Sequence, residues 1–351
     1  MTKTPISDAY AQSPQMRKLQ ERIASSQDNI FLKGLAGSSL SFVLSQAFLG
    51  AGKPFLLVFS DKEEAAYQLN DLEQLIGEQD VLFYPGSYRR PYQIEQTDNA
   101  NVLLRAEVLN RINSRKKPAV IVTYPDALFE KVVTRKELEK NTLHVKRNDT
   151  ISLDFLNEVL FEYQFARTDF VTEPGEFSVR GGIVDVFSFS HDQPYRIEFF
   201  GDEVDSIRTF DVETQLSNNQ VQKISIIPNV ANTAVQEKRE SFLQYISSKT
   251  VVYTKNEDLL FARLDDFFGK AKDAFTQLSA EIQHAQPQEL FVAAALFREQ
   301  MGRFCWVSSS QPPVSPEKGW ETVVFNTKPQ PSFNKKFDVL IQNLNDHMGQ
   351  G

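Results

Sequence analysis

The chain has 351 residues, of which 41% are hydrophobic, so it is long enough to form more than one domain with an ordinary buried core. Its single cysteine, Cys305, excludes a disulfide framework within the chain and a metal site built from several cysteines, and it suits a reducing cytoplasm. The polar segment 1–20 does not fit a signal peptide, and no apolar run is long enough to cross a membrane. We therefore expect a cytoplasmic protein without a metal or other cofactor.

The net charge of −8 is concentrated in the middle of the chain. Residues 132–230 contain 10 Lys and Arg against 17 Asp and Glu, a net charge of −7, whereas the remainder is close to neutral. A nucleic-acid-binding surface needs a basic footprint, because much of its affinity comes from contacts with phosphates. The central segment therefore predicts a protein partner rather than duplex DNA.

The first third of the chain alternates between predicted helices and strands. An amphipathic pattern predicts a helix over 13–26, and Asp61 and Glu64 have the spacing of a capping box at the start of a helix over 61–76. Further helices are expected up to residue 49 and over 102–112, with strands at 30–32, 54–59, 80–84 and 119–123. This alternation is typical of a doubly wound, parallel α/β sheet.

A candidate phosphate-binding loop lies between the first predicted strand and the next helix. The motif for such a loop is G-x-x-x-x-G-K-[ST]. Here Gly34 and Ser41 occupy its ends, but Ser39 replaces the second glycine and Leu40 replaces the lysine. An isobutyl side chain cannot neutralise phosphate charge as an ammonium group does. We therefore predict a nucleotide-binding architecture that does not hydrolyse nucleotide, with a degenerate loop that contains Gly34, Gly37, Ser39, Leu40 and Ser41.

The stretch from Tyr163 to Phe210 is the densest run of strand-like sequence. Apolar residues surround Gly181-Gly182 and alternate with charged ones up to the turn residues Gly201-Asp202, which predicts antiparallel strands joined by hairpins. Such a sheet buries one face and leaves the other in water. The expected solvent-facing set has mixed charge, which suits either a solvated surface or a docking surface, and comprises Arg180, Arg196, Glu198, Asp202, Glu203, Asp205 and Arg208.

The last third returns to an α/β pattern. Helices are predicted at 237–246 and 256–268 and strands at 250–254, 304–307 and 322–325, while 290–298 fits either a helix or a strand. These strands are expected to extend the first sheet, so that the central module is an insertion into it. We thus expect a first part of the α/β domain over 1–131, an inserted module over 132–230, a second part over 231–327, and a linker with the start of a further domain over 328–351.

Two sequence motifs give the chain a resemblance to a known family. They are residues 175–187 (GEFSVRGGIVDVF) and 195–208 (YRIEFFGDEVDSIR), with additional support from Tyr84-Pro85, Pro91-Tyr92 and the degenerate loop. On these residues the chain resembles the N-terminal, UvrB-like region of the bacterial transcription-repair coupling factors (Mfd). The resemblance covers most of 31–228 and implies a degenerate P-loop, RecA-like parallel-sheet domain with an inserted antiparallel α+β module, as in UvrB.

The resemblance implies a module that recruits the repair protein UvrA and is not itself an enzyme. Arginine suits such an interface, because its planar guanidinium group binds carboxylates in a bidentate manner. Two alternatives remain open: the arginines can pair with carboxylates of the module itself, and Phe177, Phe199 and Asp185 can be buried or paired within the sheet. The UvrA contacts carried over from the resemblance are Arg167, Phe177, Arg180, Asp185, Arg196, Phe199, Phe200, Asp202, Glu203 and Arg208.

The resemblance also implies partners for the longer family members. Their further parts bind RNA polymerase and move along DNA as an ATP-dependent translocase, and neither part is expected within this chain. The alternative function is an ATP-hydrolysing, damage-recognising fragment of the UvrB type, and a third is DNA binding by the α/β domain. UvrB has an intact phosphate loop and a long Tyr-rich hairpin, whereas here Leu40 replaces the lysine and only Tyr84, Tyr88 and Tyr92 occupy a short segment.

Overall fold

The computed structural model describes residues 5–25, 29–87, 99–114, 117–189, 191–228, 238–277, 285–309, 320–329, 333 and 336–348. Tyr88, Tyr92 and the predicted boundary between residues 230 and 231 lie outside these ranges. Among the described residues there is no helix with the length and hydropathy needed to traverse a lipid bilayer.

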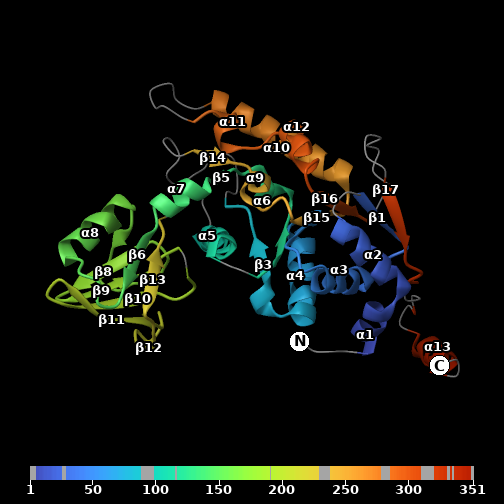
Figure 1. Ribbon diagram of the computed structural model, residues 1–351, viewed down its shortest axis with the longest axis horizontal. Helices are drawn as coiled ribbons and strands as arrows, with labels where there is room; N and C mark the ends of the chain where they lie inside the picture. Colours follow the sequence, from blue (N-terminus) through green and yellow to red (C-terminus); the bar gives the residue numbers. More distant parts are fainter. Residues whose placement is uncertain are drawn as a thin grey trace.

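Seven parallel strands form the larger sheet. Strands such as β2 and β15 are buried at every position, because helices cover both faces of a parallel sheet. Helices α2 to α4 lie on one side and α10 to α12 on the other (Figure 1). The order across the sheet is β17 (Trp320–Val324), β1 (Asn29–Lys33), β16 (Cys305–Ser308), β15 (Val251–Thr254), β2 (Phe55–Val58), β4 (Val120–Thr123) and β3 (Val81–Tyr84).

The helices of this α/β part follow the predicted pattern at their starts. Asp61 caps α4 by accepting a hydrogen bond from the Glu64 backbone N–H at 2.8 Å, and the Glu64 carboxylate accepts from the Ser60 N–H at 3.1 Å. The helices are α1 (Pro5–Gln12), α2 (Pro14–Ser25), α3 (Ser39–Ala51), α4 (Lys62–Ile76), the 3-10 helix η1 (Glu78–Asp80), α5 (Asn99–Ser114), α6 (Pro125–Phe129), α9 (Phe242–Tyr245), α10 (Glu257–Thr276), α11 (Pro287–Leu290) and α12 (Ala294–Met301); α13 (Phe337–Met348) follows them.

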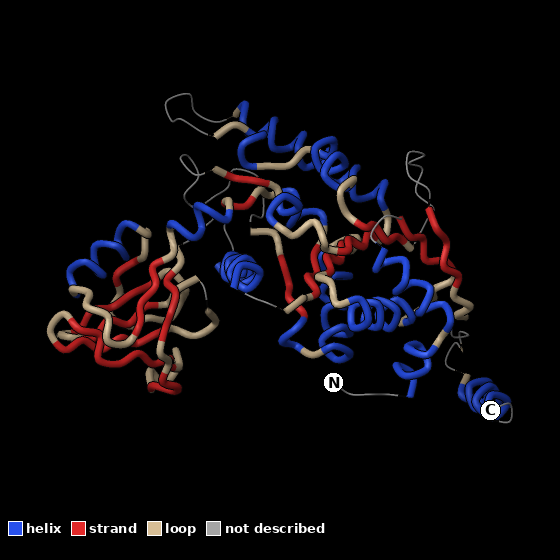
Figure 2. The backbone as a smooth tube through the Cα atoms, in the orientation of Figure 1, coloured by secondary structure: helices blue, strands red, loops and turns tan. Residues whose placement is uncertain are grey.

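A six-stranded sheet forms the core of the central module, apart from the parallel strands (Figure 2). Gly181 and Gly201 have φ of 61° and 62° in the hairpin turns, as the turn residues predict. All pairs are antiparallel except β7–β8. The order is β12 (Ser217–Gln220), β11 (Glu203–Phe210), β10 (Tyr195–Phe200), β9 (Ile183–Val186), β8 (Glu176–Arg180) and β7 (Ala166–Arg167). The expected parallel sheet with an antiparallel α+β module is thereby confirmed.

One face of this sheet is covered by the module's own elements. Leu156 and Leu160 of α8 (Leu153–Glu162) pack in the same apolar cluster as Val184 and Ile197 of the sheet. The antiparallel pair β6 (Leu143–Lys146) and β13 (Lys223–Ile226) closes the cluster with Val145, Ile224 and Ile226.

The module is joined to the α/β part by two structures. The short strands β5 (Val132–Val133) and β14 (Arg239–Glu240) pair antiparallel, so the chain enters and leaves the module side by side, next to α7 (Arg135–Lys140). Helix α5 lies between the two parts (Figure 1). Val102 and Ala106 of α5 pack in the module's core, whereas Val108 and Leu109 pack in the core of the α/β part.

A buried ion pair fixes α5 to the parallel sheet. Arg105 and Glu130 are 5% and 4% exposed, with Arg105 Nη2 at 3.3 Å from Glu130 Oε2. Arg105 Nη1 donates to the Pro85 carbonyl at 2.8 Å, and its guanidinium lies 4.3 Å from the Tyr84 ring centroid. The Ser87 N–H donates to Glu130 Oε1 at 2.7 Å, so both charges have several partners.

Two expected elements differ from the structure. Residues 237–246 do not form one helix: Arg239 and Glu240 pair with β5, and Ser241 caps the four-residue α9 by accepting from the Gln244 N–H. The helix prediction was wrong because it rested on local pattern, while the strand pairing comes from a distant segment. The ambiguous stretch 290–298 contains the end of α11, a break at Phe291, which bridges to Glu130, and most of α12.

We predict that Glu130→Ala lowers the free energy of unfolding by about 3 kcal/mol, because the Arg105 charge stays buried without its carboxylate. The double variant Arg105→Met, Glu130→Leu is expected to recover much of this loss, since it removes both charges. Urea unfolding followed by circular dichroism measures both effects. Equal stability of Glu130→Ala and the unmodified chain would contradict a stabilising role for this pair.

Candidate protein-docking face and phosphate loop

The face of the six-stranded sheet that is turned away from α8 is polar. Side chains two residues apart on a strand point to the same side, so the strand register defines two neighbouring rows on this face. We call these rows the outer face. The first row contains Ser178, Asp185, Arg196, Arg208 and Gln220, and the second contains Arg180, Ile183, Glu198 and Ser206.

Asp185 is the buried centre of the outer face, with 1% of its surface exposed. Arg196 binds it in a bidentate manner, with Nε at 2.7 Å from Oδ1 and Nη2 at 2.9 Å from Oδ2. These hydrogen bonds raise the pKa of Arg196. The Arg196 guanidinium also lies 4.6 Å from the Phe210 ring centroid, and its side chain is only 15% exposed. Arg196 is therefore held in place by the sheet itself.

Two other arginines of the outer face are paired but accessible. Arg180 forms an ion pair with Asp185 Oδ2, stacks over Phe170 at 5.5 Å from the ring centroid, and is 41% exposed. Arg208 Nη2 lies 2.6 Å from Glu198 Oε2 and is 38% exposed. The Arg208–Glu198 pair is open to water, and exposed ion pairs contribute only about 0–1 kcal/mol to stability, so Arg208 can change partners at small cost. Arg180 is bound to a buried carboxylate, so it can donate to a second partner but does not leave Asp185 cheaply.

The ten predicted contact residues occupy three environments. Arg167, Arg180, Phe200, Asp202 and Glu203 are exposed, with Phe200 at 85%, and Arg196, Phe199 and Arg208 are partly buried. Phe177 and Asp185 are buried, at 0% and 1% exposure. Their prediction as direct contacts is corrected accordingly: Phe177 packs in the module's core and edge-on to Phe161, and Asp185 holds two arginines.

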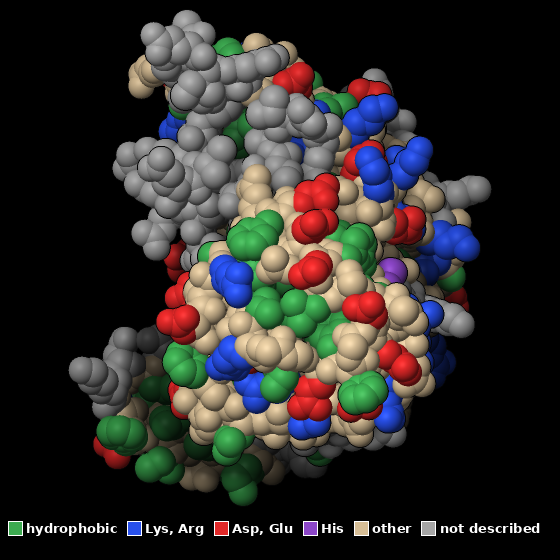
Figure 3. All heavy atoms as spheres, turned by 90° about the vertical axis from the view of Figure 1, so that its left-hand side faces the viewer, with side chains coloured by type: hydrophobic (Ala, Val, Ile, Leu, Met, Phe, Trp, Pro, Cys, Tyr) green, Lys and Arg blue, Asp and Glu red, His purple; other side chains and the backbone are tan. Residues whose placement is uncertain are grey.

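Some residues around this face had no clear signal in the sequence. Phe170 is 61% exposed and covers the Arg180 guanidinium, but an isolated aromatic residue in a loop predicts no such contact. Glu198 was predicted only as solvent-facing, whereas it accepts hydrogen bonds from both Arg208 and Ser206, the latter at 2.7 Å. Seen from the end of the module, hydrophobic side chains lie among acidic and basic ones (Figure 3), a composition that occurs in protein interfaces.

Residues that follow β17 contact the phosphate-loop segment. The Phe325 N–H donates to the Lys33 carbonyl at 2.8 Å, and the Thr327 hydroxyl donates to the Gly34 carbonyl at 2.9 Å. The same hydroxyl accepts from the Ala36 N–H at 2.8 Å. A Cβ atom on Gly34 would lie 2.0 Å from the Phe325 carbonyl oxygen. The segment after β17 therefore packs directly on the loop between β1 and α3.

The polar side chains of the loop are also engaged. Ser41 Oγ lies 2.8 Å from Asp71 Oδ2 and 3.0 Å from Gln68 Oε1, so its single proton is directed to α4. The equivalent hydroxyl of an intact motif binds Mg²⁺. Ser39 Oγ accepts from the Ala36 N–H at 2.8 Å, and Leu40 packs against the main core. Among the groups that would bind phosphates, the Ala36 N–H and the Ser41 hydroxyl thus have partners within the chain.

Metal binding has no support among the described residues. Over the ranges given above, no group of three or more His, Cys, Asp or Glu side chains is placed to hold an ion.

The central part of the chain matches the model of a known domain family. Residues 143–231 match the model of the UvrB interaction domain. This range begins at β6, ends shortly after β13, and contains the whole six-stranded sheet. The chain is also 30% identical over 240 residues to the transcription-repair-coupling factor of Bacillus subtilis, with 66% of this chain and 20% of that protein covered.

The expected resemblance is confirmed. The chain is similar to transcription-repair-coupling factors from other bacteria as well. It is 25% identical over 287 residues to the protein of Haemophilus influenzae, covering 76% of this chain and 25% of that protein. It is 27% identical over 197 residues to that of Escherichia coli, covering 56% of this chain and 17% of that protein. The chain thus spans about a fifth of the length of these relatives.

We predict that Gly34→Ala lowers the free energy of unfolding by at least about 3 kcal/mol, because the new methyl group meets the Phe325 backbone as well as a strained φ. Gly37→Ala is the matched control: Gly37 has φ of 57° with open space around its Cα, so only backbone strain of about 1 kcal/mol applies. Thermal unfolding of the two variants compares these losses. Equal losses would show that the segment after β17 does not pack on the loop.

Proposed function

We propose that this chain recruits UvrA in transcription-coupled nucleotide excision repair and is not itself an enzyme. The match to the UvrB interaction domain and the similarity to transcription-repair-coupling factors support a role in transcription-coupled repair. The observation that carries the proposal is the pair Arg180 and Arg208, which present accessible guanidinium groups, 41% and 38% exposed, on one sheet face. In the longer relatives, we propose, further parts supply RNA polymerase binding and ATP-dependent movement on DNA.

In the proposed complex, ion pairs between the module and UvrA form beside, or in place of, ion pairs within the module. A carboxylate of UvrA can approach Arg208 and share or replace Glu198, because that pair is open to water. Arg180 keeps its bond to the buried Asp185 and offers its exposed N–H groups to a second carboxylate. Once the interface excludes water, the same charge pairs become stronger and more specific. Arg196 keeps its bidentate pair with Asp185 and supports the neighbouring strands rather than changing partners.

The remaining exposed residues complete the proposed contact area. Phe200 lies at the end of β10 beside Asp202 and Glu203, at the tip of the hairpin with β11. An exposed phenyl ring next to charged side chains is typical of the few residues that contribute most of the binding energy in an interface. Arg167 on the edge strand β7 is in register with the buried Phe177, so its exposed side chain lies on the opposite side of the sheet and is not part of this contact area.

The absence of catalysis is proposed from the loop. Leu40 replaces the phosphate-binding lysine, and the Thr327 hydroxyl accepts the hydrogen bond of the Ala36 N–H, a donor that a phosphate would need. The alternative, an ATP-hydrolysing fragment of the UvrB type, requires both an ammonium group at position 40 and free loop amides.

We predict that Arg180→Glu and Arg208→Glu each weaken binding to purified UvrA at least about tenfold, because a contact charge is reversed. Lys62→Glu, an exposed charge reversal on α4, is the control of equal net charge and is expected to bind as the unmodified chain does. Isothermal titration measures the affinities, and circular dichroism verifies the fold. Unchanged affinity of both arginine variants would refute the docking face.

We predict no ATP turnover by this chain, and none by Leu40→Lys, since the lysine alone leaves Thr327 on the loop. Phosphate release and binding of a fluorescent ATP analogue measure this. Turnover by the unmodified chain that disappears in Ser41→Ala would favour the UvrB-type enzyme instead.

A further inference from the structure

A pocket of about 340 Å³ lies on the α/β part, remote from the outer face and from the phosphate loop. Pro54, Ala119 and Thr250 line it, and these residues immediately precede β2, β4 and β15. The pocket therefore opens at the amino ends of the parallel strands, whereas Gly34 follows the carboxyl end of β1. Its volume falls in the range of about 300–1,000 Å³ that is typical of ligand sites.

The lining combines an apolar floor with a cationic rim. Ile112, Ile121 and Ile246 form much of the floor. The rim has Arg111, Lys117 and Arg135, and none of the described residues that line the pocket carries a carboxylate side chain. The pocket rim is therefore positively charged, although the net charge of the chain is −8.

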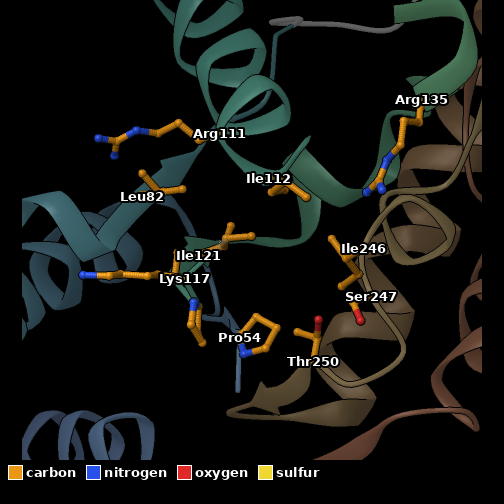
Figure 4. Close-up of a pocket in the computed structure, with 12 residues that line it drawn as sticks. Pro54, Leu82, Arg111, Ile112, Lys117, Ile121, Arg135, Ile246, Ser247 and Thr250 are labelled. Atoms are coloured by element: carbon orange, nitrogen blue, oxygen red, sulfur yellow. The ribbon is translucent and has the colours of Figure 1, made fainter. Parts of the chain in front are cut away.

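The cations flank the floor from two sides (Figure 4). Arg111 and Lys117 extend in the same direction, away from Ile112 and Ile121, and Arg135 points toward Ile246 from the other side. The contacts of Arg111 are long, at 3.5 Å from Nε to Glu107 and 3.4 Å from Nη1 to the Gln79 carbonyl. Arg135 Nη2 lies 3.4 Å from the Tyr245 carbonyl, and its guanidinium lies 5.4 Å from the Tyr245 ring centroid and interacts with the charge of Glu240. Arg111 and Lys117 must therefore turn to meet an anion on the floor, and for Arg111 this breaks only long contacts.

We propose that this pocket binds an acidic peptide segment of a partner protein. One bulky apolar side chain of the peptide fills the floor, and carboxylates before and after it pair with Arg135 on one side and with Arg111 and Lys117 on the other. The cations lie on both sides of the apolar floor. An extended peptide can place carboxylates on both sides of an apolar side chain, whereas the charge of a compact ligand would reach the cations on one side only. Association is steered by the cations and weakens as salt concentration rises.

The test uses a fluorescein-labelled peptide of sequence Asp-Glu-Asp-Phe-Asp-Glu-Asp and the full chain. Fluorescence anisotropy measures its affinity, and methyl NMR shifts of Ile112, Ile121 and Ile246 report where it binds. We expect saturable binding that Lys117→Glu weakens about tenfold, while Lys272→Glu, an exposed charge reversal on α10, leaves it unchanged. Lys117 is exposed, so its replacement is not expected to affect folding.

Two control ligands make the assignment falsifiable. A peptide with Ser in place of Phe, and one with Lys in place of each acidic residue, are both expected to bind at least about tenfold more weakly. Equal binding of either control, or an unchanged affinity of Lys117→Glu, would overturn the proposal. Octanoate is a third control. If it shifts the same isoleucine methyl signals and binds more tightly than the peptide does, as measured by displacement of the peptide, the pocket would instead be a site for a small amphiphilic anion and the proposal would be overturned.

Discussion

The buried carboxylate of Asp185 is the interaction on which the outer face of the module depends. A carboxylate that is 1% exposed must be compensated, and here two arginines from neighbouring strands meet it. Arg196 binds the Asp185 carboxylate in a bidentate manner and is largely buried. Arg180 binds the same carboxylate, so its position is fixed, but its side chain stays open to solvent. One buried charge thus fixes the strand register and at the same time orients an accessible guanidinium group.

The two parts of the chain differ in how their candidate sites meet solvent. In the α/β part, the segment after the last strand packs on the loop between β1 and α3 through Thr327 and Phe325. In the module, the charged face stays open. Helix α5 connects them through Val102 and Ala106 on one side and Leu109 on the other, and the buried pair Arg105–Glu130 links it to the α/β part.

Much of the fold followed from local sequence, whereas the pairing of side chains did not. Alternation around Tyr195 and Ile197 predicted the antiparallel module, which the structure confirms, whereas the degenerate loop inferred from Leu40 stays a prediction. The sequence left open whether Asp185 is a contact or a partner within the sheet, because this depends on the register of three strands. The closure by Thr327 joins residues almost 300 positions apart, at Gly34 and Ala36, and no local pattern encodes it. The helix expected near Arg239 failed for the same reason, since β5 pairs with it from across the module.

Hydrogen–deuterium exchange of the chain with and without purified UvrA tests the central claim most directly. The account predicts slower exchange of backbone amides over 176–210, which contain β8 to β11, and unchanged exchange over 34–41 and in α3. Slower exchange confined to the α/β part, with 176–210 unaffected at saturating UvrA, would contradict the assignment of the outer face as the docking surface.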